Sequence, residues 1–342
     1  MTTLIQDKIF SKITELLHSA RARIVSSVNI QMVYTYFEIG RVIVEHEQQG
    51  EERAKYGKST LKELSHKLTS EFGRGFSVDN LAKMRQFYIV YSKSETLSQI
   101  SDDKTKTQTV SAKFNLSWSH YVALIGLDDL SRQFYEVEAI KNHWGVREME
   151  RQITSKLFER LAISKDDNQI KLLATEGQII EKPEDIIKEP YILEFLGLEN
   201  QKYTETELES KIINNLESFL LELGKGFAFM GRQKRFSFEN QHFYVDLVFY
   251  NRLLKCFVLI DLKIGEIKHQ DLGQMQMYVN YYDRFEKTED ENKTIGILLC
   301  GRKNEAVVEI TLPKDSNIFA KEYQLYLPTK EQLEAQVRKV LT

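Results

Sequence analysis

The chain has 342 residues, of which 42% are hydrophobic and 28% charged, a composition typical of globular proteins rather than disordered or fibrous ones. Single hydrophobic cores stop growing beyond roughly 250–300 residues, so this length predicts two domains. The formal net charge of −3 excludes a uniformly basic nucleic-acid binder, and no apolar run is long enough to predict a membrane-spanning helix.

The charge is divided unevenly between the two halves of the chain. Residues 1–170 hold 24 Lys/Arg and 22 Asp/Glu, whereas residues 171–342 hold 23 and 28. Any nucleic-acid contact must therefore come from a local patch, and the carboxylates of the second half suit a cation. Cys256 and Cys300 stand in apolar stretches, which predicts buried side chains rather than a disulfide or a zinc site. Because the first residues lack the layout of a signal peptide, we expect a cytoplasmic protein without membrane association.

Residues 1–90 carry apolar side chains at the three- and four-residue steps that indicate helices. Two shorter helices are expected over about 59–72 and 78–91, separated by the sequence GRG. This is the outline of a helix-turn-helix, with Lys83 and Arg85 where a recognition helix carries its DNA contacts. The alternative is that both are ordinary surface charges on a helical hairpin that never meets DNA.

The middle of the chain contains the expected domain boundary. Residues 92–113 are polar and without periodicity, which predicts a surface loop, and helical patterning then continues to about 162. We place the linker within 166–190, which combines polar runs with prolines, so the expected domains are 1–165 and 191–342. The first domain would bind DNA or mediate assembly, including assembly of a homo-oligomer.

The period of the pattern changes at residue 204. A helix with a single apolar stripe is expected first, ending at Gly224 or Gly226. Strands rich in β-branched and aromatic residues follow, broken by ENQ and NRLL, and then a helix over about 269–285 and the strand TIGILLC. A further strand is expected at YQLYL and a final helix over 330–341. The order α-β-β-β-α-β predicts one sheet flanked by helices, an α/β domain behind an α-helical N-terminal domain.

The strand FVLIDLK brings an acid and a base to its end. Asp261 and Lys263 are two residues apart, so their side chains share one face of the strand. If the preceding turn is centred on the RL pair of NRLL, Asp246 lies opposite Leu259 and one diagonal step from Asp261. This register predicts that Asp246, Asp261 and Lys263 converge.

A carboxylate within FYVDLVFY costs several kcal/mol if it is buried without a partner, and a bound cation would offset that cost. Asp246, Asp261 and the carbonyl oxygen of Leu262 form a hard oxygen site suited to Mg²⁺ or Mn²⁺. Lys263 would orient the attacking water or stabilise charge on a phosphate. The alternative for Asp261 and Lys263 is a solvated ion pair at a strand end.

Two helices can complete this site. Glu209, on the helix before the sheet, can add a carboxylate ligand, although neighbouring glutamates on the same helix make a surface charge the alternative. Gln274 and Tyr278 stand four residues apart on the following helix, hence on one face, and both can hydrogen-bond phosphate oxygens or water. Lys268, after the strand, is a candidate for contact with a substrate phosphate, or else a solvated cation.

These residues resemble a known nuclease signature. Asp246 together with the DLK of Asp261 and Lys263 resembles the PD-(D/E)XK motif, Glu209 stands where that superfamily often has a helical acid, and QMQMY resembles the QxxxY element of its RecB-like members. The stretches LLELGKGFAFMGRQKRF, FYVDLVFY, GQMQMYVNYYD, YFEIGRVIVEHEQQG, EFGRGFSVDNLAKMRQFY and LSWSHYVALI resemble the YhcG family of nucleases. That resemblance covers nearly the whole chain.

The resemblance implies a helical N-terminal domain for DNA binding or assembly and a restriction-endonuclease-like C-terminal domain. Two positions depart from the motif: Val245 replaces its proline, and Asp261 replaces the commoner glutamate. Both departures are tolerated in the superfamily. The aspartate is one methylene shorter, which shortens its reach to a metal.

The expected function is a metal-dependent nuclease that hydrolyses DNA phosphodiester bonds with Mg²⁺ or Mn²⁺, and nothing in the residues excludes RNA. The alternative is a non-catalytic nucleic-acid-binding or assembly protein that retains the nuclease fold, because a fold does not establish a function. The joint presence of Asp246, Asp261 and Lys263 argues against this alternative, since a degenerate site usually loses one of its residues.

Overall fold

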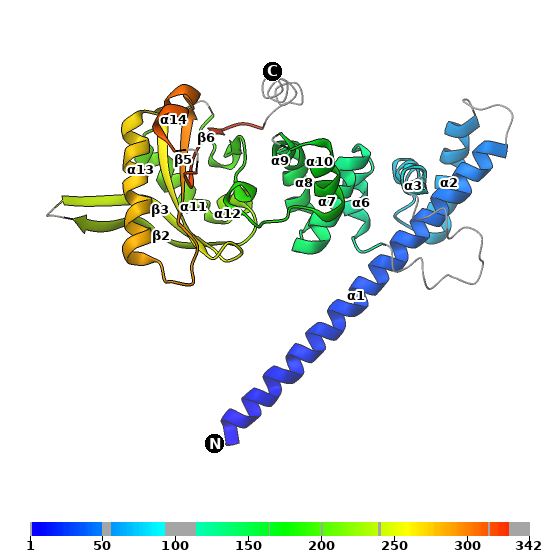
Figure 1. The fold of residues 1–342 in the computed structure, drawn as a ribbon. Coiled ribbons are helices and arrows are strands. Elements are labelled where there is room, and N and C mark those ends of the chain that lie inside the picture. Colours follow the sequence, from blue (N-terminus) through cyan, green and yellow to red (C-terminus); the bar gives the residue numbers. More distant parts are fainter. Residues whose placement is uncertain are drawn as a thin grey trace. The chain divides into compact units, whose positions relative to one another are not determined.

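The structure is a computed structural model, which describes residues 2–49, 56–92, 114–163, 165–199, 201–238, 241–313 and 315–327. The chain forms two compact units that divide between Glu150 and Arg151 (Figure 1). The expected loop over 92–113, apart from its first residue, and the expected final helix over 330–341 lie outside the described residues.

The predicted linker over 166–190 differs from the structure. It contains α10 (Asp167–Glu176) and the short 3-10 helix η1 (Pro183–Ile186), and both belong to the second unit. Asp166 begins α10 with a capping box, in which its carboxylate accepts the backbone N–H of Gln169. Leu173 is buried, so this polar-looking segment packs as part of a folded unit.

The first unit is built from helices. Their bounds are α1 (Thr2–Gln49), α2 (Tyr56–Phe72), α3 (Val78–Ser92), α6 (Trp118–Leu124) and α7 (Asp129–Asn142), followed by α8 (Val146–Thr154), which crosses the division. The helices predicted over 59–72 and 78–91 are therefore confirmed as α2 and α3.

An aromatic cluster joins α1, α3 and α6. The ring of Phe87 on α3 lies 5.7 Å from that of Phe37 on α1 and 5.0 Å from that of Tyr121 on α6. Gly40 lets α1 approach α3 closely, because a Cβ at this position would stand 2.1 Å from the carbonyl oxygen of Met84. Both the aromatic rings and the missing Cβ fix the packing of these helices.

The second unit is a mixed sheet with helices on both faces, and the predicted order α-β-β-β-α-β is confirmed. Its elements after α10 and η1 are β1 (Tyr191–Ile192), η2 (Glu194–Leu196), α11 (Glu205–Asn214), α12 (Leu216–Leu223), β2 (Phe227–Phe238), β3 (Gln241–Asn251), β4 (Cys256–Glu266), α13 (His269–Tyr281), η3 (Tyr282–Glu286), β5 (Ile295–Arg302), α14 (Glu305–Thr311) and β6 (Ile318–Gln324); α9 (Leu157–Ala162) precedes them.

The strand order is β1-β6-β5-β4-β3-β2. Strands β2, β3 and β4 are antiparallel, whereas β4, β5, β6 and β1 run parallel to their neighbours. The strand expected at YQLYL is formed instead by the preceding IFAKEYQ, whose alternate residues Ile318 and Ala320 are buried.

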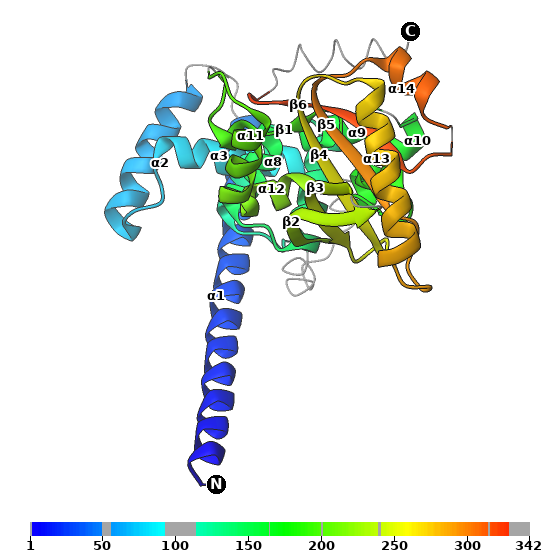
Figure 2. The ribbon, with the colours of Figure 1, turned by 90° about the vertical axis from the view of Figure 1, so that its left-hand side faces the viewer.

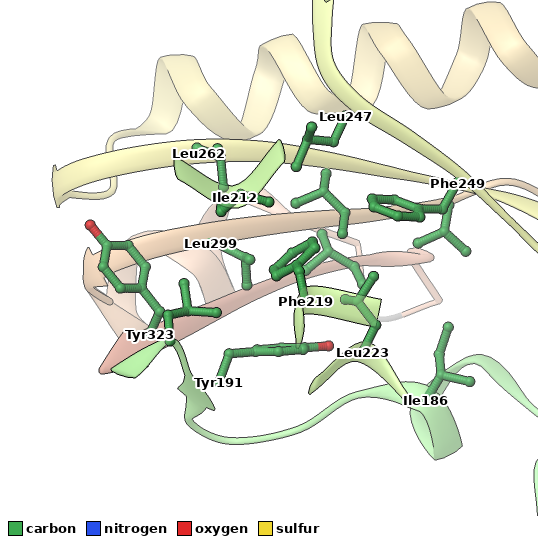
Figure 3. Packing of buried hydrophobic residues seen from close by; sticks show 14 of the residues in the cluster. Ile186, Tyr191, Ile212, Phe219, Leu223, Leu247, Phe249, Leu262, Leu299 and Tyr323 are labelled. Atoms are coloured by element: carbon green, nitrogen blue, oxygen red, sulfur yellow. The ribbon is translucent and has the colours of Figure 1, made fainter. Parts of the chain in front are cut away.

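Two cores hold the sheet between its helices. On one face, Ile212 of α11 and Phe219 of α12 pack against Phe249 and Leu299 (Figure 3). On the other face α13 packs against the sheet, and Figure 2 shows α13 across the sheet from α11 and α12. Both cysteines are buried and free, as predicted.

The helix expected from 204 is two helices. Thr204 starts α11 with a capping box that includes Glu207, and the chain leaves helical geometry at Asn215, between α11 and α12. This break separates Glu209 on α11 from Glu222 on α12, and the two carboxylates have different surroundings.

Across the described part of the chain, no helix combines the length and apolarity needed to cross a membrane.

Candidate active site

The candidate site lies where β3 and β4 separate. The last pair of their ladder is Leu247 with Ile260, and one position further Asp246 faces Asp261. The predicted register is wrong by two residues, since Val248 and not Asp246 is opposite Leu259. Because side chains alternate with a period of two, an error of two residues leaves every side chain on its predicted face.

Asp246 connects three segments of the second unit. Its Oδ2 accepts a hydrogen bond of 2.9 Å from the backbone N–H of Leu262, so the side chain continues the link between the strands beyond the last ladder pair. Its Oδ1 accepts one of 3.0 Å from Nε2 of Gln233 on β2. The carboxylate is thereby held in one orientation toward β4.

Glu209 joins the site through the same glutamine. Gln233 Nε2 donates a second hydrogen bond, of 2.7 Å, to Glu209 Oε2. Burial raises the pKa of Glu209, the bond from Gln233 opposes this shift, and the charge of Asp246 adds to it. The structure therefore brings the predicted helical acid within reach of Asp246 by way of one amide group.

The sequence interpretation missed Gln233. Its backbone φ of 45° lies in the left-handed region, which residues other than glycine adopt rarely and at a cost. The side-chain amide lies between the two acids and donates to both of them. Residue 233 falls opposite Asp246 in the β2–β3 register. A correct prediction of that register would have pointed to Gln233.

Asp261 and Lys263 form an ion pair inside the site. Asp261 is 3% exposed, and its Oδ2 lies 2.7 Å from Lys263 Nζ. That contact lacks hydrogen-bond geometry, so Oδ2 is a buried oxygen with no hydrogen-bond partner among the described residues. Lys263 Nζ also lies 3.8 Å from the carboxylate of Glu205, at the start of α11. The alternative of a solvated ion pair does not fit the burial of Asp261.

The pKa values of this pair are shifted together. Burial, followed by the charge of Asp246, raises the pKa of Asp261 to about 7 against the opposing charge of Lys263. Burial alone would lower the pKa of Lys263, but the charge and hydrogen bonding of Asp261 together with the charges of Glu205 and Asp246 hold the pKa above its ordinary value. A buried carboxylate beside a second carboxylate favours either a proton or a cation between them.

Gln274 and Tyr278 lie together on α13, as their spacing predicts. Gln274 Nε2 donates a hydrogen bond to Tyr278 Oη. Burial raises the pKa of Tyr278, and the charges of Asp261 and Asp246 act in the same direction. The phenol is therefore within electrostatic range of the two aspartates.

The remaining predicted contacts do not join this group. Lys268 is an exposed residue at the N-cap of α13, where its backbone N–H donates to Asp271 Oδ2 at 2.8 Å. Lys83 and Arg85 belong to the first unit and are each paired, with Asp79 at 2.7 Å and with Glu47 at 2.6 Å.

The donor set fits a divalent cation without forming a complete cage. Among the described residues, no three His, Cys, Asp or Glu side chains are gathered at metal-binding distance. Asp261 Oδ2, which makes an ion pair but no hydrogen bond, and the fixed carboxylate of Asp246 are nevertheless the kind of oxygen pair that Mg²⁺ or Mn²⁺ takes. Such ions complete their coordination with water and substrate oxygens.

Comparisons with known proteins find similarity along most of the chain. Residues 184–338 match the YhcG PDDEXK nuclease domain, and residues 12–160 match the DUF1016 N-terminal domain. The chain is 39% identical to a protein of Escherichia coli (strain K12) named "Putative nuclease YhcG", over 97% of this chain and 93% of that protein.

Two solved structures show a weaker likeness. One is titled as the crystal structure of a repair endonuclease from Pyrococcus abyssi, with 18% identity and a TM-score of 0.26 over 38% of this chain and 50% of that one. The other is titled as an EndoMS-dsDNA2 complex, with 16% identity and a TM-score of 0.27 over 38% and 49% of the two chains. This chain thus matches about half the length of each.

Proposed function

The chain belongs to the YhcG family and carries its PDDEXK nuclease domain, and we propose that it hydrolyses DNA phosphodiester bonds with a divalent cation as cofactor. The observation that carries this proposal is the buried carboxylate of Asp261, which faces the half-buried Asp246 and lies 2.7 Å from Lys263 Nζ. Burying a carboxylate beside a second one is costly unless a ligand uses the two.

Each residue of the site has a separate part in the proposal. Asp246, Asp261 and the carbonyl oxygen of Leu262 would hold Mg²⁺ or Mn²⁺, and Glu209 would act as a ligand directly or through water. When bound, such a cation polarises a phosphoryl oxygen and offsets the charge that develops during cleavage.

The remaining groups would act on the substrate. Lys263 carries a positive charge, which would orient the attacking water and stabilise the negative charge that develops on the phosphate. The hydrogen-bonded pair of Gln274 and Tyr278 would contact the phosphate backbone from α13. None of these groups reads a base, so the site itself would cleave without sequence preference.

The test is cleavage of linear, circular and single-stranded DNA by the purified chain with Mg²⁺, Mn²⁺ or EDTA. Asp261→Asn removes one proposed ligand and keeps the shape of the side chain. Asp167→Asn, an exposed residue on α10, is the matched control. We expect divalent-dependent cleavage by the wild type and the control, and none by Asp261→Asn.

Cleavage that persists in EDTA or in Asp261→Asn would contradict the proposal. If all three proteins leave every DNA intact while still binding it, the non-catalytic function is supported instead. Including RNA among the substrates decides which nucleic acid is cut.

A further inference from the structure

The β2–β3 hairpin extends outward from the candidate site. Beyond Gln233 and Asp246 the two strands remain paired from Lys234 with Val245 to Phe238 with Gln241. Figure 1 shows this ribbon reaching past α13, away from the rest of the sheet. At about 3.4 Å per residue, the five paired positions reach roughly 17 Å beyond the site.

One face of the ribbon is anchored to α13. The ring of Phe236 stacks on Tyr281 of that helix at 4.1 Å and on its cross-strand partner Phe243 at 5.4 Å, and it meets Tyr278 edge-on at 5.5 Å. A bare two-stranded ribbon is marginally stable in water, and these rings supply the missing support.

The opposite face carries polar and aromatic groups. The cross-strand pairs on this face are Arg235 with Tyr244 and Ser237 with His242. Arg235 lies 3.1 Å from the ring of His242, and Ser237 Oγ lies 2.8 Å from His242 Nδ1. Tyr244 is 45% exposed. The face is thus ordered, and it offers hydrogen-bonding groups to a partner.

Three positive charges stand at the root of the ribbon. Arg232, Lys234 and Arg235 are exposed, and none makes an ion pair with any described residue, although the charge of Arg232 acts on the nearby Glu209. From 227 to 245 the sequence contains one acid, Glu239, against three Lys/Arg. Unpaired cations on a projecting element fit a polyanion.

We propose that this ribbon binds duplex DNA through its major groove and holds the duplex over the site. Arg232, Lys234 and Arg235 contact phosphates, while the face of Ser237, His242 and Tyr244 lies toward the base edges. The major groove of B-form DNA, about 12 Å wide, admits a two-stranded β-ribbon, whereas that of an A-form RNA helix is too narrow. Duplex DNA is therefore the form of nucleic acid that this element fits.

The root of the ribbon ties binding to the site. Gln233, at the start of the projecting part of β2, donates to both Asp246 and Glu209. A duplex on the ribbon would therefore meet the chain directly beside the two aspartates. That the ribbon holds the duplex for cleavage rests on the proposed nuclease function. The binding of the duplex does not rest on that function, because it needs no metal.

The test is binding of a short fluorescent DNA duplex by the full chain in EDTA over a series of salt concentrations. The variant is the double substitution Lys234→Gln and Arg235→Gln. Its charge-matched control is Arg252→Gln with Lys255→Gln, two exposed cations in the turn at the other end of β3. Duplex RNA and single-stranded DNA serve as competitors, and cleavage with Mn²⁺ is measured in parallel.

We expect the ribbon variant to bind more weakly and to lose about 1.8 from the slope of log affinity against log salt, about 0.9 for each phosphate contact. The control should keep the wild-type slope, and duplex DNA should compete best. An unchanged slope in the ribbon variant, an equal loss in the control, or stronger competition by RNA would overturn the inference. Loss of binding in the ribbon variant without any Mn²⁺-dependent cleavage by the wild type would uphold the inference and contradict the nuclease.

Discussion

Asp246 and Asp261 face each other one position beyond the last pair of the β3–β4 ladder, and the side chain of Asp246 accepts the backbone N–H of Leu262. The strands therefore separate where two carboxylates meet, and a side chain continues the link between them. This arrangement places the hydrogen-bonded carboxylate of Asp246 beside a buried oxygen of Asp261 that has an ion pair with Lys263 but no hydrogen bond.

Lys263→Gln should slow cleavage strongly but preserve metal binding. In the proposed function the ammonium group of Lys263 orients the attacking water and stabilises charge on the phosphate. Loss of one such catalytic group typically lowers the rate by about 10²–10⁴-fold. It is not a metal ligand in this account. We expect turnover to fall by that order, while Mn²⁺ still raises the melting midpoint of the variant. A variant that cuts at the wild-type rate would show that Lys263 has only a structural part.

Gln233→Met should make the thermal stability of the protein depend more strongly on divalent ions. The substitution removes the Nε2 donor that Glu209 and Asp246 share and keeps the length of the side chain. The two acids then lose their common partner, which costs about 1 kcal/mol or less at this solvent-accessible position. We expect a lower melting midpoint in EDTA and a larger rise with Mn²⁺ than in the wild type. Equal rises in both proteins would contradict this role for the amide.

Glu222→Gln should strongly destabilise the second unit. Glu222 is fully buried, and its carboxylate binds Arg160 at 2.5 Å, Arg151 at 3.4 Å and the backbone N–H of Ile192 at 2.9 Å. Breaking such a network leaves a buried guanidinium unpaired, at about 3–5 kcal/mol. Denaturant titration should show this loss, and Glu217→Gln, exposed on the same helix, should show almost none.

The same carboxylate predicts a pH dependence. Burial alone would raise the pKa of Glu222, but the charges of Arg160 and Lys188 outweigh it and hold the pKa below its ordinary value of 4.5. Its contribution to stability is therefore present above pH 4.5 and is lost as the pH falls through the lowered pKa. The wild type and Glu222→Gln should accordingly converge in stability at strongly acidic pH. If the difference in stability between the two proteins is as large at strongly acidic pH as at neutral pH, the charge of Glu222 is not its cause.

Gly40→Ala should destabilise the first unit. The new Cβ would stand 2.1 Å from the carbonyl oxygen of Met84, so α1 and α3 must move apart. Overpacking of this kind costs about 1–3 kcal/mol. Gly273→Ala on α13 is the opposite case, because nothing lies within 4 Å of its Cβ, and a helical alanine gains about 1 kcal/mol. Thermal melting should show opposite shifts, and two shifts of the same sign would contradict the packing.

Periodicity in the sequence was sufficient to predict much of the fold. The apolar spacing located α2, α3 and α13, and the two-residue period of strands placed Asp246, Asp261 and Lys263 on one face despite the error in register. Helix spacing likewise predicted that Gln274 and Tyr278 meet. These features depend on local repetition, which a sequence displays directly.

Features that depend on distant contacts could not be predicted in this way. Arg85 is paired with Glu47, 38 positions earlier in the chain, and nothing in the local pattern indicates that pair. Gln233 has a positive φ in the middle of β2. A glycine would have indicated such a conformation in the sequence, and there is none at this position. The segment over 166–190 reads as a linker because its surface is polar, yet buried Leu173 and Ile186 join it to the second unit.

A calorimetric titration of Mn²⁺ into the metal-free chain and its Asp246→Asn and Asp261→Asn variants would show whether these two carboxylates bind the metal. We expect a saturable site in the wild type, which also remains in Lys263→Gln, and a loss of at least tenfold in affinity in each aspartate variant. Binding of equal strength in Asp261→Asn, or no binding by the wild type, would contradict the assignment of these two carboxylates as the metal site.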